Sequence, residues 1–78
     1  MHFNPQVEQL IQQSLQLTSQ GQFAKALAGF DQVRKADATY TNDNPQIQFA
    51  AGQCLAATGR VEASITAFRR VTELLPSN

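Results

Sequence analysis

The sequence predicts an all-α fold in which two helix-turn-helix hairpins stack in a single domain spanning residues 1–78. Apolar residues recur at helical spacing through most of the chain, and the alternation typical of strands is missing. Gly21 and Gly59 each end one helical stretch and precede another. The two halves also carry matching residues. Because 78 residues are too few for two independent cores, the hairpins are expected to share one.

The first hairpin begins at Asn4 and Pro5, where Asn can cap a helix and Pro suits its first position. A helix is predicted over residues 5–19, and Gly21 is suited to end it because glycine accepts the left-handed conformation. A second helix is predicted over residues 22–36. The first stretch has its helically spaced positions at Val7, Leu10, Ile11, Ser14 and Leu15, and the second at Phe23, Ala26, Leu27, Phe30 and Val33.

Residues 37–43 are polar and poor in helix formers, so a loop is predicted there. Asn44 and Pro45 then repeat the start signal of the first hairpin. A helix is predicted over residues 45–58, with Gly59 after it. Its apolar stripe consists of Ile47, Ala50, Ala51, Cys54 and Leu55.

The last helix is predicted over residues 61–75 and stops before Pro76. Glu62 lies in its first turn, and Arg69 and Arg70 lie near its end. These positions suit the helix dipole, which favours anions at the start and cations at the end. The two arginines are interpreted as solvated charges near the helix end.

The two halves match when Gly21 is aligned with Gly59. In this alignment Phe30 matches Phe68, and other apolar and small positions also correspond. The two Asn-Pro pairs, however, lie two residues further apart than the two glycines. Either the turn within the first hairpin is two residues longer, or each Asn-Pro pair only marks where a helix starts. We favour the second interpretation because a tight turn between packed helices tolerates little change.

The segments 21–30 and 59–68 resemble the Gly-x-aromatic-x-x-Ala-x-x-x-Phe/Tyr signature of the tetratricopeptide repeat family. The resemblance implies two repeats, at about residues 5–38 and 45–78, forming a fragment of an α-α superhelix. Ser64 departs from the signature alanine, and Ala38 stands where a proline is expected. The alternative is an ordinary four-helix up-down bundle.

Members of this family bind other proteins, so the resemblance implies a non-enzymatic adaptor, scaffold or small chaperone-like module. Its concave groove would receive an apolar or amphipathic peptide segment. Carried over by position, the groove would be lined by Glu8, Ile11, Leu15, Thr18, Gln46, Phe49, Gln53, Ala56 and Ala57. Because the first helices of both hairpins contain no cation, the carboxylate clamp of one branch of the family is not expected here.

Phe49 is the most informative of these residues because it lies off the apolar stripe of its helix. An aromatic side chain in such a position is a candidate anchor for a partner. The alternative is that Phe49 covers the neighbouring helix at residues 5–19.

The last helix presents apolar side chains that cannot all reach the helices behind it. If Ile65, Leu74 and Leu75 stayed in water, a small domain would lose several kcal/mol, at about 1.5–3 kcal/mol for each side chain. We therefore expect self-association through this helix, most simply as a two-fold homodimer. The alternative function is then a structural homodimerisation or assembly module. The alternative to self-association is that the chain is a fragment whose missing neighbour covers this side.

Other functions find little support in the composition. Six Lys and Arg balance six Asp and Glu, so the chain lacks the excess of cations that nucleic-acid binding needs. We expect no enzyme, no metal and no cofactor: Cys54 is read as a buried apolar residue, and His2 is the sole histidine. No apolar run reaches the length of a membrane span and no signal peptide is evident, so a cytoplasmic location is expected.

Overall fold

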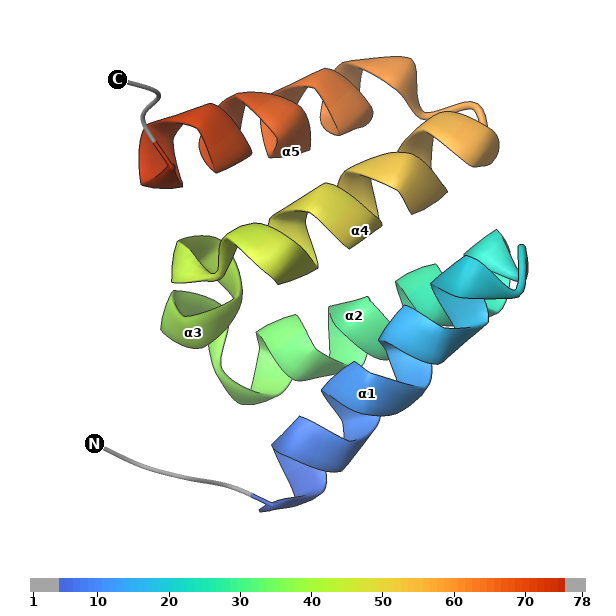
Figure 1. Ribbon diagram of the computed structural model, residues 1–78, viewed down its shortest axis with the longest axis vertical. Coiled ribbons are helices and arrows are strands. Elements are labelled where there is room, and N and C mark those ends of the chain that lie inside the picture. Colours follow the sequence, from blue (N-terminus) through green and yellow to red (C-terminus); the bar gives the residue numbers. More distant parts are fainter. Residues whose placement is uncertain (1–4, 76–78) are drawn as a thin grey trace.

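The computed structural model describes residues 5–75, whose regular elements are all α-helices (Figure 1). Within this range the helices are α1 (Pro5–Ser19), α2 (Phe23–Ala36), α3 (Ala38–Asp43), α4 (Pro45–Ala57) and α5 (Val61–Leu74). The four long helices begin and end within about one residue of the predicted bounds. The expected cap Asn4 and the expected stop Pro76 lie outside the described residues. No helix in the described range is long and apolar enough to cross a membrane.

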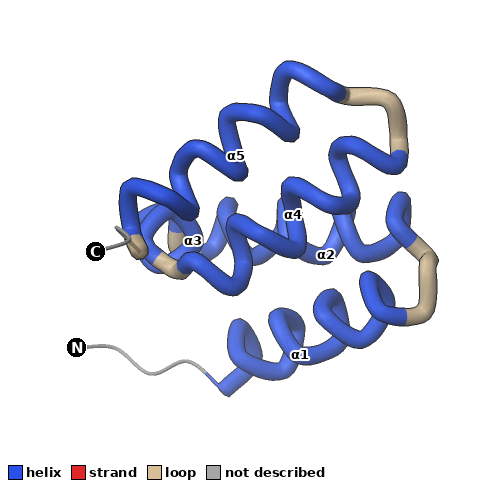
Figure 2. The backbone as a smooth tube through the Cα atoms, turned by 45° about the horizontal axis from the view of Figure 1, so that its top comes forward, coloured by secondary structure: helices blue, strands red, loops and turns tan. Residues whose placement is uncertain are grey.

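The long helices pack in two antiparallel pairs, α1 with α2 and α4 with α5 (Figure 2). Gly21 and Gly59 join the helices of each pair with φ angles of 80° and 84°, which a side chain would disfavour. The N–H of Gly21 donates to the carbonyl of Thr18 over 3.1 Å, and that of Gly59 donates to Ala56 over 3.2 Å. The two turns are therefore built alike around corresponding glycines.

This likeness decides how the two hairpins are aligned. With the turns superposed through Gly21 and Gly59, Pro45 begins α4 two positions later than Pro5 begins α1, so α4 is the shorter helix. The interpretation that the Asn-Pro pairs only mark helix starts is confirmed. At Asn44 the capping role is also visible, because its Oδ1 accepts from the N–H groups of residues 46 and 47 over 3.0 and 3.2 Å.

The prediction of a loop over residues 37–43 is wrong, because α3 occupies most of this segment. Asp37 caps it: its Oδ1 accepts from the N–H of Tyr40 over 3.0 Å. The hydroxyl of Thr41 donates back to the Asp37 carbonyl over 3.0 Å. Threonine and asparagine have poor intrinsic helix propensity, but one well-capped turn packed against its neighbours overrides that preference.

The core lies where α4 packs against both helices of the first pair, so α4 stands between α5 and α1–α2. Its fully buried members come from three helices and are Ile11, Ala26, Phe30, Val33, Ile47, Ala50 and Cys54. The prediction that Cys54 is a buried apolar residue is confirmed, since its side chain is inaccessible and lies in this cluster.

Small residues let the helices of each pair cross closely. A Cβ atom built on Gly29 would lie 2.0 Å from the Oγ and 3.2 Å from the Cβ of Ser14. In the second pair, a Cβ atom on Gly52 would lie 2.7 Å from the ring of Phe68. The hydroxyl of Ser64 donates to the carbonyl of Gly52 over 2.9 Å, which satisfies a buried polar group at this crossing.

Candidate functional site

A groove runs along the side of the molecule on which α2 and α5 flank α4. It encloses about 1220 Å³ and is closed at one end by α3. Helix α4 supplies its floor, since α2 and α5 each pack against α4 (Figure 1). The lining is formed by Ala24, Leu27, Ala28, Phe30, Asp31, Arg34, Thr41, Asn42, Gln48, Ala51, Leu55, Thr58, Arg60, Ala63, Thr66, Ala67 and Arg70.

Small apolar side chains give the groove its width. Five alanines from α2, α4 and α5 form part of its lining, and two leucines add apolar surface. More than half of the lining residues are polar or charged, so the groove offers a ligand both apolar contact and polar partners.

The cations at the rim of the groove differ in their pairing. Arg34 forms an ion pair with Asp31, which also lies 3.7 Å from Lys35. Arg70 is paired as well. The guanidinium of Arg60 forms no ion pair or hydrogen bond with any described residue, so it is available to an incoming carboxylate.

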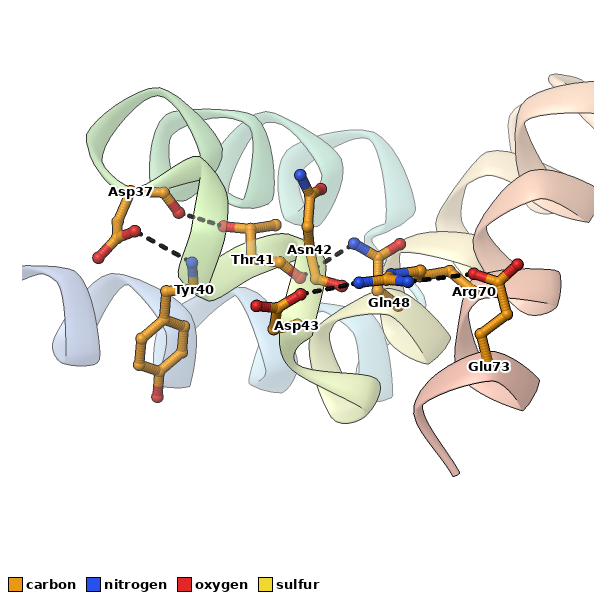
Figure 3. Close-up of polar contacts among 8 residues, drawn as sticks. All are labelled: Asp37, Tyr40, Thr41, Asn42, Asp43, Gln48, Arg70 and Glu73. Atoms are coloured by element: carbon orange, nitrogen blue, oxygen red, sulfur yellow. Dashed lines mark hydrogen bonds and ion pairs between the residues drawn. The ribbon is translucent and has the colours of Figure 1, made fainter. Parts of the chain in front are cut away.

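Arg70 closes the groove by joining α5 to the end of α3 (Figure 3). Its Nε donates to the carbonyl of Asn42 over 2.9 Å, and its Nη2 lies 2.8 Å from Asp43 Oδ1. Its Nη1 also donates to Glu73 over 3.1 Å. The expectation that Arg70 is merely a solvated charge near the helix end is therefore wrong: it joins two helices that are distant in sequence.

Gln48 also contacts the end of α3. Its side-chain amide on α4 donates to the carbonyl of Thr41 over 2.9 Å (Figure 3). Together with Arg70, it satisfies carbonyl groups in the last turn of α3, which a short helix would otherwise leave to water.

Hydrogen bonds to Glu73 and then to Asp43 raise the pKa of the Arg70 guanidinium above its ordinary value. Folding therefore favours the protonated form of Arg70. The contribution of protonated Arg70 to the stability of the fold is complete below the ordinary arginine pKa. It is lost only as the pH rises past the raised pKa of the folded state. Deprotonation of Arg70 consequently does not open this end of the groove at any physiological pH.

Replacing Arg70 by methionine is expected to release α3 while the long helices persist. Methionine keeps the apolar stem but removes every donor to α3, so the amides of Tyr40 to Asn44 should exchange with deuterium faster than in the parent chain. The control is Arg70→Lys, which keeps the charge but not the planar fork and should give an intermediate rate. Unchanged exchange in Arg70→Met would show that Gln48 and packing alone hold α3.

The residues expected to line a groove from their positions in the two first helices lie elsewhere. Glu8, Ile11, Leu15, Thr18, Gln46, Phe49, Gln53, Ala56 and Ala57 are all absent from the lining of the groove described above, although Ala57 borders a smaller hollow beside Gly21. Ile11 is only 4% exposed and belongs to the core, so it offers almost no surface to a partner. Whether the exposed members of this set bind a peptide stays a prediction.

Two polar members of this set make contacts within the chain. Glu8 Oε2 accepts from the Tyr40 hydroxyl over 3.5 Å, which links α1 to α3. Thr18 donates to the carbonyl of Ser14 over 2.9 Å, and its Oγ1 lies 3.4 Å from Cys54 Sγ. These contacts connect α1 to its neighbours.

Phe49 is half exposed and packs against α5. Its ring lies edge-on to that of Phe68, with centroids 5.6 Å apart and planes at 61°. This ring contact joins Phe49 to the last helix, and the alternative in which Phe49 covers the helix at residues 5–19 stays a prediction. The aromatic pair places Phe49 beside the residues expected to self-associate, of which Ile65 and Leu75 are exposed and Leu74 is half buried.

The residues that sequence reasoning missed are those of the groove. Its alanines are ordinary helix residues, and no local pattern distinguishes an alanine in a groove from any other. Asp37 before Ala38 was the one signal that could have revealed α3, since Asp is a preferred helix cap.

Residues 5–75 contain no group of three His, Cys, Asp or Glu side chains that could hold a metal ion. No protein-family model, curated protein or solved structure matches the chain.

Proposed function

We propose that this chain is a non-enzymatic protein-interaction module of tetratricopeptide-repeat type, and that it binds an apolar peptide segment of another protein. The repeat assignment rests on the residues that resemble the family signature and on the two turns that are built alike at Gly21 and Gly59. The interaction role rests chiefly on one observation, the groove between α2, α4 and α5.

The groove suits a peptide with apolar side chains and an acidic residue. Its alanine-rich walls leave room for the side chains of an incoming segment, and Leu27 and Leu55 offer them apolar contact. The unpaired Arg60 would attract a carboxylate at one end, whereas Arg34 and Arg70 already have acidic partners. The site proposed from the geometry thus lies on the α2–α5 side, away from the surface expected from sequence.

A display library of short random peptides, selected on the immobilised protein, tests this proposal. Recovered peptides should be rich in apolar residues and carry Asp or Glu. Their affinity should fall about tenfold or more for Ala63→Leu, because the added side chain fills the exposed groove without disturbing the core. Arg60→Met should weaken acidic peptides selectively and should reduce the dependence of binding on salt.

The matched control is Gln53→Leu, which adds apolar bulk to an exposed position of α4 outside the groove. It should leave the affinity unchanged. Loss of binding in Gln53→Leu with full binding in Ala63→Leu would move the site to the surface that the sequence indicated. Failure to recover any peptide that binds specifically would contradict the proposed function.

A further inference from the structure

An apolar seam runs along the exposed side of α5. It consists of Val61, Ile65 and Phe68, the polar Thr72, and Leu75 directly after the end of the helix, spaced by four, three, four and three residues. This is the heptad spacing by which one helix packs against another. Val61, Ile65 and Leu75 are 60%, 50% and 60% exposed, so these apolar side chains remain in contact with water.

The first repeat shows what the seam lacks. When the two repeats are aligned on their turn glycines, Ile11 corresponds to Phe49 and Phe30 to Phe68. Ile11 and Phe30 are 4% and 3% exposed because α4 packs over them, whereas Phe49 is 50% exposed. In the first repeat, α4 covers the surface that contains Ile11 and Phe30. No helix among the described residues covers the corresponding surface of the second repeat.

A copy stacked head to tail would not fill this place well. The face with which α4 packs on the first pair carries Ile47, Ala50 and Cys54. The corresponding residues of α1, in the same alignment, are three exposed glutamines: Gln9, Gln12 and Gln16. Placing α1 of another molecule on the seam would bury these polar amides, one of which, that of Gln12, donates to Glu8 over 3.4 Å, at a cost in free energy.

The charges beside the seam favour a different arrangement. Glu62 and Arg69 are exposed, lie one heptad apart and immediately follow the seam residues Val61 and Phe68. Neither side chain takes part in any ion pair or hydrogen bond with the described residues. On two antiparallel copies of α5, positions 62 and 69 face each other twice, once on each side of a two-fold axis.

We propose that α5 is a self-association surface, on which a second copy of this chain packs its own α5 in the antiparallel direction. Ile65 then packs beside Phe68 of the partner subunit, and Glu62 pairs with Arg69 of the partner subunit, each contact occurring twice. Phe49 extends the apolar surface on the side of α4, so α4 and α5 of both copies form a four-helix layer. This interface is separate from the groove, so both surfaces are usable at once.

Sedimentation equilibrium from about 1 μM to about 1 mM tests the arrangement by measuring the dissociation constant of the dimer. The single changes Glu62→Arg and Arg69→Glu each set like charges opposite each other and should raise that constant about tenfold or more. The control is Lys25→Glu, which alters the net charge as much as Arg69→Glu does but lies on α2, and it should leave the constant unchanged.

Two further measurements separate a charge effect from a folding defect. The double change Glu62→Arg with Arg69→Glu should restore the parent constant, and an equimolar mixture of the two single variants should form a heterodimer. Circular dichroism should show the same helix content in all variants. A parent chain that stays monomeric over the whole range, or single variants that dimerise as well as the parent, would overturn the proposal.

Discussion

Replacing Ile47 by alanine is expected to leave much of the protein unfolded at 25 °C. Ile47 is completely buried at the centre of the cluster that joins α4 to α1 and α2. Removing a buried Ile side chain costs about 2–5 kcal/mol, because apolar transfer is lost and a cavity remains. A domain of this size has a free energy of unfolding of about 5 kcal/mol or less, so the substitution removes most of its stability.

Urea titration followed by circular dichroism measures this effect, with all variants compared at one protein concentration. The control is Gln46→Ala, an exposed neighbour on the same turn of α4, which should change the free energy of unfolding by less than about 0.5 kcal/mol. A loss below about 1 kcal/mol for Ile47→Ala would mean that the first pair and α4 do not depend on this core.

Replacing Gly29 by leucine is expected to force α1 and α2 apart. Even a Cβ atom at this position would clash with the side chain of Ser14. Ser14 is buried, and its hydroxyl donates to the carbonyl of Leu10 over 2.8 Å. Overpacking costs about 1–3 kcal/mol where neighbours can shift, and more where they cannot. Here the obstacle is another helix, so a loss of about 3 kcal/mol or more is expected in the same titration.

Ala28→Leu is the matched control because it adds the same side chain one residue earlier, facing the open groove. It should be nearly neutral for stability. The double change Gly29→Ala with Ser14→Gly should be more stable than Gly29→Ala alone. It places Gly at position 14 and Ala at position 29, which are the residue types that the second crossing has at the corresponding positions 52 and 67. If Gly29→Leu proved as stable as Ala28→Leu, the close crossing of α1 and α2 would be contradicted.

The antiparallel helix pairs could be predicted because their signals are local. Asn44 and Pro45 mark a helix start, and Gly21 and Gly59 supply the turns whatever lies around them. The same local reasoning missed α3, because its threonines have low helix propensity and tertiary contacts outweigh it. Arg70 illustrates the limit further, since its partners on α3 lie 27 and 28 residues earlier in the chain.

The candidate sites depend even more on tertiary packing. Ile11 and Phe49 occupy equivalent places in the two helix pairs and both were expected to line a groove, yet one is buried under α4 and the other is half exposed. Exposure depends on whether a following helix is present, and neither residue carries that information. The sequence likewise does not indicate which alanines line the groove, because a hollow is created by the spacing between helices.

By itself, the sequence determined that the chain is all helical and where its four long helices lie, because capping, turn geometry and helical periodicity act within a few residues. Only the tertiary structure decided that residues 38–43 form a helix, that the groove opens between α2 and α5, and that Phe49 meets Phe68. The groove and the aromatic pair depend on side chains brought together from helices far apart in the chain, and α3 is held by such contacts in addition to its local cap at Asp37.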